Sequence, residues 1–389
     1  MPQILHSIRI LSGVSTANFL VRFHHYLVAF AITTFLATFI DEVSIGFALA
    51  AASAVIAASL FVSPHLFMRF GTKSVLIFLG LAGILSTVGL SVSGHAVFAL
   101  AMFAIQGVVA YNIMLGLDLL LESRSVNDET GRLRGIYLVI SNLAVLVSVI
   151  SLSRILDRGG YDDVFIIAAA FLIPFTIMAA ILLPKMSSLS QAKRSPFVAT
   201  VQRMVSRPQI LIISGLHFLV LLFFTWTIYY VPLYLVNHIG FSWEIAGMLI
   251  TLSVLPYVLF EFPLGRIADL YLGEKEITIV GFVLMSVATA TLSFLSDSSL
   301  FMWASIIFLG NAGGAAIEVM TETHFFKLVS VEDGDMIGVF RMLRPLSAIV
   351  GPILASLALL AVPFYLLFSF FGAFMILAIP LLAMMKDSR

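Results

Sequence analysis

The sequence contains two pairs of carboxylates near the ends of otherwise apolar stretches, and the two acids of each pair are one helical turn apart. Asp118 and Glu122 form one pair, and Glu318 and Glu322 form the other. Residues four apart share one face of a helix, so each pair could act together. An acid in apolar surroundings is costly unless it takes up a proton or meets a cation. The pairs are therefore candidates for proton transfer or for ion pairing.

The composition indicates what surrounds these acids. Of 389 residues, 61% are hydrophobic and 11% are charged, whereas about 25% are charged in soluble domains. We therefore expect the lipid bilayer as a partner. The net charge of zero gives no argument for nucleic acid. The absence of cysteine excludes disulfides and thiolate metal sites, and we expect neither a metal nor a cofactor.

Twelve apolar runs are long enough to cross a bilayer, whose hydrocarbon core requires about 20 residues of helix. The fold expected is an all-α polytopic membrane protein with 12 transmembrane helices. The expected helices cover residues 17–40, 43–67, 74–93, 96–121, 136–156, 164–183, 210–237, 243–264, 277–296, 299–323, 336–361 and 363–385.

The loops indicate the orientation of these helices. The even-numbered connections hold most basic residues, namely Arg69, Lys73, Arg124, Arg132, Arg134, Arg266, Lys275, Lys327, Arg341 and Arg344. The odd-numbered connections hold almost none, with Arg154 and Arg158 as the exceptions. Because cytoplasmic loops carry the excess of Lys and Arg, we expect both termini in the cytoplasm.

The longest connection separates two six-helix bundles. We place the N-terminal bundle at residues 1–184, a basic cytoplasmic central loop at 185–209 and the C-terminal bundle at 210–389. Within the loop, Phe197, Val201 and Met204 recur at helical spacing. This pattern fits a short amphipathic helix on the anionic inner leaflet, and a solvated linker is the alternative.

The two halves repeat in sequence. Asp118 and Glu122 align with Glu318 and Glu322, and the motif that ends in Lys73 aligns with the one that ends in Lys275. Internal repeats of this kind are typical of secondary transporters. We therefore expect the two bundles to be pseudo-symmetric.

The stretch "GRIADLYLGEK" resembles the signature of the major facilitator superfamily. The matching residues are Gly265, Asp269, Gly273 and Lys275, with one extra residue before the second glycine. The first-half copy keeps Arg69, Gly71 and Lys73 but has Pro64 and Met68 where the family has glycine and an acid. Phe103 stands where many proton-driven drug antiporters have arginine, which argues against that branch.

The resemblance implies that cytoplasmic ion pairs hold the inner side closed when the outer side is open. The gate candidates are Asp118, Glu122, Arg132, Arg134, Glu261, Asp269, Glu318, Glu322, Arg341 and Arg344. Asp269 could pair with Arg132 or Arg134, and Glu322 with Arg341 or Arg344. Topology signals and proton carriers are the alternative roles of these charges.

The resemblance also implies a central cavity lined by the first, fourth, seventh and tenth helices. The polar candidates for substrate contact are Arg22, His25, Tyr26, Thr33, Gln106, Tyr111, Asn112, His217, Thr225, Trp226, Tyr229 and Asn311. Each could instead be an interhelical hydrogen-bond partner or part of an interfacial belt.

Arg22 and His25 are the most informative of these candidates. An unpaired arginine would favour an anionic substrate, and histidine titrates in the range useful for proton coupling. Arg22 could instead snorkel to the interface, or an acid such as Asp118 or Glu318 could neutralise it.

These features predict a secondary active transporter that moves a small solute by alternating access, with proton coupling suspected. A phosphate-binding loop and a catalytic constellation are both missing from the sequence, so we expect no enzyme. The alternative is a non-transporting membrane sensor or scaffold on a degenerate transporter fold. We expect a monomer in a prokaryotic cytoplasmic (inner) membrane.

Overall fold

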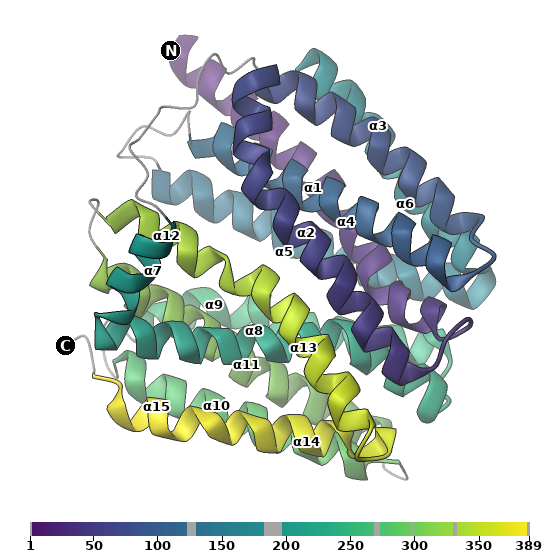
Figure 1. Ribbon diagram of the computed structural model, residues 1–389, viewed down its shortest axis with the longest axis vertical. Helices are drawn as coiled ribbons and strands as arrows, with labels where there is room; N and C mark the ends of the chain where they lie inside the picture. The colour runs from purple at the N-terminus through teal and green to yellow at the C-terminus, as the bar shows by residue number, and fades with distance from the viewer. Residues whose placement is uncertain are drawn as a thin grey trace. The chain divides into compact units, whose positions relative to one another are not determined.

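The computed structural model of the protein describes residues 2–122, 130–182, 197–267, 273–296, 299–329 and 333–386 (Figure 1). Side chains are described within these ranges except at 2–11, 121–136, 138, 261–262, 265–267 and 334. Regular structure throughout the described ranges is helical. The chain forms two compact units. Unit 1 comprises Met1–Asp41, Ala51–Ser190 and Phe241–Gly247, and unit 2 comprises Glu42–Ala50, Gln191–Gly240 and Met248–Arg389.

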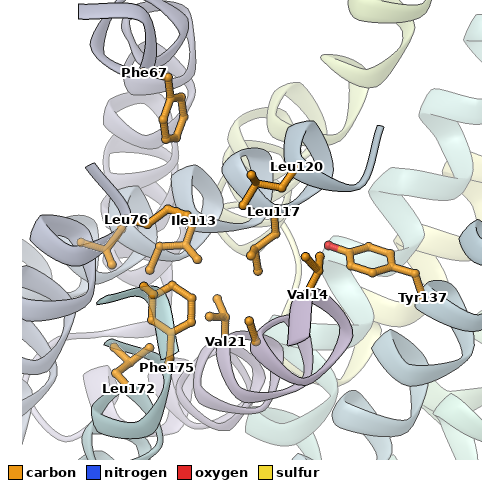
Figure 2. Close-up of a cluster of buried hydrophobic side chains, with 13 residues drawn as sticks. Val14, Val21, Phe67, Leu76, Ile113, Leu117, Leu120, Tyr137, Leu172 and Phe175 are labelled. Atoms are coloured by element: carbon orange, nitrogen blue, oxygen red, sulfur yellow. The ribbon is translucent and has the colours of Figure 1, made fainter. Parts of the chain in front are cut away.

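The long helices of unit 1 pack around an apolar core. They are α1 (Pro2–Leu36), most of α2 (Glu42–Phe70), α3 (Thr72–Ser91), α4 (Ala96–Glu122), α5 (Thr130–Arg158) and α6 (Tyr161–Ile181). Helix α1 packs on α4, α5 and α6, and α3 packs on α4 and α6. Val21, Ile113, Leu117 and Phe175 are fully buried where α1, α4 and α6 meet (Figure 2). This core fixes the polar side chains of α1 and α4.

Unit 2 holds the second set of helices, several of them interrupted. They are α7 (Phe197–Val205), α8 (Pro208–Leu233), the π-helix η1 (Tyr234–His238), most of α9 (Trp243–Ile267), α10 (Glu274–Thr291), η3 (Leu292–Phe294), α11 (Leu300–Leu328), α12 (Gly334–Arg341), α13 (Leu343–Leu359), η5 (Phe364–Leu366), α14 (Leu367–Phe374), η6 (Met375–Leu377) and α15 (Ala378–Met384). Helix α8 packs on α11 and α13, and α10 packs on α11 and α14.

The described part of the chain contains twelve helical spans long and apolar enough to cross a membrane, as the sequence predicts. Their limits differ from the expected ones in two informative places. The first helix, α1, begins at Pro2 rather than at 17, because the polar residues before 17 continue the helix. The eleventh is divided at Met342 into α12 and α13. Pro345 accounts for the break, because it has no N–H to bond the carbonyl of Arg341.

Both units contain the same turn before equivalent helices. Gly71 precedes α3 with φ of 79°, and Gly273 precedes α10 with φ of 83°. Residues that carry a side chain rarely adopt this left-handed backbone conformation, so glycine is required at both positions. The two glycines are the ones that the sequence aligns, and the common backbone turn supports the repeat.

The first turns of α2 and α9 make matching contacts. Ser356 on α13 donates to the carbonyl of Val43 in unit 2 (2.6 Å), and Ser153 on α5 donates to the carbonyl of Trp243 in unit 1 (2.8 Å). A β-carbon at Gly46 would lie 2.1 Å from Ser356 Oγ. One at Gly247 would lie 2.2 Å from Ser153 Cβ. Both close approaches therefore require glycine.

The central loop contains a helix, α7, in its described part, and the expected placement of this helix on the inner leaflet stays a prediction. Its Thr200 and Met204 are buried, and α7 packs on α12. Arg207 pairs with Asp333 at 2.8 Å, and Arg203 lies 3.7 Å from Asp335. The expected boundaries of the loop at 185 and 209 stay a prediction.

Candidate functional site

A chain of polar contacts in unit 1 orients Arg22 on α1. Arg22 Nε donates to Asn18 Oδ1 at 3.0 Å, one turn earlier on the same helix. Asn18 Nδ2 donates to Ser141 Oγ on α5 at 2.7 Å, and Ser141 donates to the carbonyl of Tyr137 at 2.8 Å. Every partner in this chain is neutral. Within the described ranges Arg22 belongs to no ion pair.

The two adjacent histidines of α1 have different surroundings. His24 is fully buried, and its Nδ1 lies 2.9 Å from the carbonyl of Ala168 on α6. A carbonyl only accepts, so Nδ1 carries the proton and Nε2 can accept from Gln106 Nε2 at 3.1 Å. His24 thereby links α1 to both α4 and α6 as a neutral imidazole. Its role is structural.

His25 lies instead among aromatic rings. Its ring makes edge-to-face contacts with Tyr26 on α1 and Tyr111 on α4, with centroids 5.2 Å apart in each pair. His25 is 8% exposed, and its Nδ1 has no hydrogen-bond partner in the described part of the protein. Tyr26, Tyr111 and Arg22 are half-buried. The structure thus brings Arg22, His25, Tyr26 and Tyr111 onto one side of α1 and the facing part of α4.

The other candidates of unit 1 are more deeply packed. Asn112 donates to Ser59 Oγ (2.8 Å) and to the carbonyl of Val108 (2.7 Å), and it accepts from Ser63. These contacts use its whole amide, so Asn112 joins α4 to α2. Thr33 and Gln106 are fully buried, and Thr33 Oγ1 and Gln106 Oε1 have no partner among the described residues.

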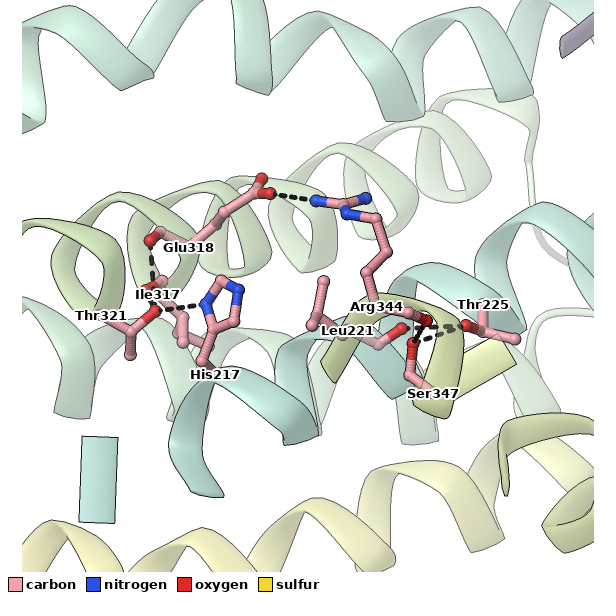
Figure 3. A network of polar contacts seen from close by, with 8 residues as sticks. All are labelled: His217, Leu221, Thr225, Ile317, Glu318, Thr321, Arg344 and Ser347. Atoms are coloured by element: carbon pink, nitrogen blue, oxygen red, sulfur yellow. Dashed lines mark hydrogen bonds and ion pairs between the residues drawn. The ribbon is translucent and has the colours of Figure 1, made fainter. Parts of the chain in front are cut away.

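Unit 2 holds its own polar network, between α8, α11 and α13 (Figure 3). Arg344 Nη2 donates to Glu318 Oε1 at 2.8 Å, with 46% of the arginine side chain and 17% of the glutamate side chain exposed. Thr321 Oγ1 donates to the carbonyl of Ile317 at 2.7 Å and lies 2.9 Å from His217 Nδ1. Because the threonine proton is directed to the backbone, His217 Nδ1 acts as the donor. The second ring nitrogen of His217 points away from Thr321 (Figure 3).

Other candidates of unit 2 are satisfied within its core. Trp226 donates to the carbonyl of Gly351 at 2.9 Å and stacks on Phe371 with centroids 3.7 Å apart. Thr225 donates to the carbonyl of Leu221 at 3.0 Å. The remaining contacts are Asn311 Nδ2 with the carbonyl of Ile307, Asn311 Oδ1 with Tyr257 Oη at 3.3 Å, and Thr225 with Ser347 at 3.4 Å. Tyr229 is half-buried.

The gate candidates are only partly described. Arg344 pairs with Glu318, whereas the sequence suggested Glu322 as the acid, and Glu322 and Arg341 are exposed. Asp118 is half-buried. The candidates whose side chains lie outside the described residues are Glu122, Arg132, Arg134, Glu261 and Asp269.

The family-motif residues lie at helix ends. Arg69 places its guanidinium 5.3 Å from the ring centroid of Phe70. Lys275 Nζ donates to the carbonyl of Met385 at 2.7 Å. Lys73 is half-buried, and Gly265 lies within α9.

Sequence reasoning missed the residues that orient Arg22 and His217. Asn18 precedes Arg22 by one turn, and that spacing could have indicated it. Ser141 and Thr321 carry no comparable local signal, because their partners come from other helices. In the described ranges no group of three His, Asp or Glu side chains could hold a metal ion.

Comparison with known proteins identifies the family but no specific relative. The model described as Major Facilitator Superfamily matches residues 14–250 and 213–389. No functionally curated protein matches the chain.

Several solved transporter structures share the fold. A bacterial homolog of the human lysosomal transporter Spinster has a TM-score of 0.77 at 11% identity, over 96% of both chains. The D-xylose–proton symporter has a TM-score of 0.75 at 14% identity over 98% of both chains. The nucleoside transporter NupG has a TM-score of 0.74 at 14% identity, over 98% of this chain and 100% of its own. At these identities the likeness concerns the fold alone, whereas the family match extends over both repeats. The chain belongs to the Major Facilitator Superfamily.

Proposed function

We propose that the protein is a secondary active transporter that moves a small solute by alternating access and couples this movement to protons through Glu318. The observation that carries the coupling is the pair of Glu318 with Arg344, which joins α11 to α13. Membership in the superfamily supports the transport role.

The surroundings of Glu318 support a role in proton coupling. Glu318 lies on the membrane-spanning helix α11 and precedes Leu328, the end of the helix, by ten residues, or about 15 Å at 1.5 Å per residue. Only 17% of its side chain is exposed.

A carboxylate in such surroundings has two acceptable states. It is ionised beside Arg344, or it is protonated and neutral. Protonation removes the charge that holds Arg344, which weakens the link between α11 and α13. Uptake and release of a proton would thus change how these two helices are joined, which is the kind of two-state element that transport requires.

The exposed and half-buried charges near the helix ends are proposed as the cytoplasmic gate. Asp118, Glu322 and Arg341 would contribute, with the further gate candidates on α4, α5 and α9. Single cysteines can report on this gate, because the chain has no cysteine of its own. Glu322→Gln or Arg341→Gln should change the labelling of an inward-facing cysteine, and unchanged labelling in both would contradict the gate.

Counterflow in proteoliposomes tests the function. Sugars, nucleosides, amino acids and organic anions form the panel. Saturable exchange of one class supports a transporter, whereas no exchange across the panel favours a non-transporting sensor or scaffold.

Glu318→Gln then tests the coupling. We expect exchange to persist and accumulation driven by a pH gradient to be lost. Glu276→Gln is the control, since it removes an exposed carboxylate on α10 that has no place in the proposed gate. Gradient-driven accumulation in Glu318→Gln would contradict the coupling role.

The setting proposed is a prokaryotic cytoplasmic membrane, with both termini in the cytoplasm and a monomer as the working unit. Reporter fusions at each terminus test the orientation.

A further inference from the structure

We propose that Arg22 forms an oxyanion site within unit 1 and that the transported solute is an organic anion whose carboxylate or phosphate binds there. The substrate class rests on the transport function proposed above. The site itself rests on the contacts and surroundings of Arg22.

Among the described residues, no acidic side chain pairs with Arg22. In the described part of the chain its hydrogen bond runs from Nε to the neutral amide of Asn18, and the terminal guanidinium nitrogens can take another partner. The two acids that could have neutralised it do not do so. Glu318 is paired with Arg344, and Asp118 forms no ion pair with Arg22 among the described residues.

The contacts of Arg22 hold its guanidinium against neighbouring helices. Nε is bonded to Asn18 on α1, and Asn18 is bonded to Ser141 on α5. Arg22 lies fourteen residues before Leu36, the end of the first span, or about 21 Å along the helix. A cation within an apolar span is costly unless an anion or water meets it.

The surroundings of Arg22 fit a ligand with an oxyanion group and an apolar body. Asn18, fixed by Ser141, holds the guanidinium by Nε and leaves a planar set of donors that matches a carboxylate or a phosphate. His25 and Tyr26 follow at three and four residues, on the same face of the helix. The Nδ1 of the buried His25 has no partner among the described residues and offers a further hydrogen bond to the ligand. The rings of His25, Tyr26 and Tyr111 form an aromatic wall beside it.

Charged thiol reagents test this site without knowledge of the substrate. The chain has no cysteine, so Tyr26→Cys gives a single reactive thiol one turn from Arg22. The probes are two methanethiosulfonates of similar size, anionic sulfonatoethyl and cationic trimethylammonioethyl. Their relative rates of reaction report the local electrostatic potential.

We expect the thiol to react faster with the anionic reagent than with the cationic one. Arg22→Gln should lower the ratio of the anionic to the cationic rate by about tenfold or more, because it removes a unit charge a few ångströms away in a medium of low dielectric. Arg22→Lys should keep the ratio high. Arg69→Gln is the control, because this exposed arginine lies at the end of α2. Tyr111→Cys serves as a second reporter, on α4.

A ratio that Arg22→Gln leaves unchanged at both reporters would overturn the proposal. The reaction rates do not depend on transport. A protein without exchange activity but with the Arg22-dependent ratio would therefore keep the anion site and lose the transport function. Exchange of neutral solutes by a protein whose reagent ratio does not depend on Arg22 would support the transport function and contradict the anion site.

Discussion

The two units each hold an arginine on a membrane-spanning helix, but the partners of the two arginines differ in charge. Arg22 in unit 1 contacts the neutral Asn18, whereas Arg344 in unit 2 contacts the carboxylate of Glu318. The same glycine turn precedes α3 and α10. The repeat has therefore kept its backbone geometry while its polar chemistry diverged. Under our proposals, unit 1 meets the charge of the solute and unit 2 meets the proton.

The packing of equivalent helices differs as well. A β-carbon on Gly313 of α11 would lie 2.5 Å from the carbonyl oxygen of Gly281 and 2.8 Å from the amide nitrogen of Met285, both on α10. In unit 1, a β-carbon on Gly83 of α3 would meet the side-chain methyl groups of Val109 and Leu172. Backbone atoms thus limit how closely α10 and α11 approach each other in unit 2, whereas movable side chains surround Gly83 in unit 1.

The largest effect should come from adding a methyl group at this packing difference. Gly313→Ala should lower the free energy of unfolding by about 2–3 kcal/mol, because backbone atoms cannot move aside, and Gly83→Ala by about 1 kcal/mol. Thermal unfolding of both variants in nanodiscs measures the difference. Equal losses would show that the two helix pairs pack alike.

Removal of one charge from the pair in unit 2 should have the next largest effect. Arg344→Gln leaves Glu318 without its cation and should cost about 2 kcal/mol, less than a fully buried pair because Arg344 is half exposed. The double variant Glu318→Gln with Arg344→Gln should recover part of this loss. Chemical unfolding measures the stability of both variants. A double variant less stable than Arg344→Gln alone would show that the unpaired carboxylate of Glu318 is not the cause of the loss in Arg344→Gln.

A carboxylate introduced beside Arg22 should make unit 1 resemble unit 2. Asn18→Asp places an acid 3.0 Å from Arg22 Nε if the geometry of the present contact persists. We expect it to abolish the preference for the anionic thiol reagent while changing the free energy of unfolding by about 1 kcal/mol or less. Asn18→Ala is the control that removes the contact without adding charge. A preserved anion preference in Asn18→Asp would mean that Arg22 does not set the potential there.

The smallest effect should come from the ion pair that joins α7 to the region of α12. Arg207→Gln removes a partner of Asp333, and 45% of the arginine side chain is exposed. Exposed pairs contribute about 0.2–1 kcal/mol, and salt screens them. Unfolding at low and high ionic strength should differ for the unmodified protein more than for the variant. If Arg207→Gln leaves the effect of salt on the free energy of unfolding unchanged, the ion pair does not hold α7, and the contacts of Met204 with its apolar neighbours do.

The number and type of the spans could be predicted from sequence, because a long apolar run in a bilayer has to be helical. The break at Met342 could also have been read from Pro345. The start of α1 could not, since the helix continues through polar residues that an apolar pattern does not include. Hydrophobicity thus predicts the part of a helix inside lipid rather than the whole helix.

The site was less predictable because its partners come from distant parts of the chain. Glu318 and Glu322 share a helix face, and sequence could not show that Arg344 contacts the deeper of the two. The adjacent His24 and His25 were equally ambiguous. Only the position of Ala168 and Gln106 shows that His24 is the structural one. Side-chain types were visible in the sequence, but their pairing depended on tertiary packing.

The serine contacts at the start of α2 and α9 have a kinetic consequence. Each of these helices contributes residues to both units, and the bonds of Ser356 and Ser153 hold the first turn of each helix to the rest of one unit. We therefore expect the two bonds to contribute to the activation barrier between conformations. Ser153→Ala and Ser356→Ala should change the turnover number while leaving the affinity for the solute unchanged.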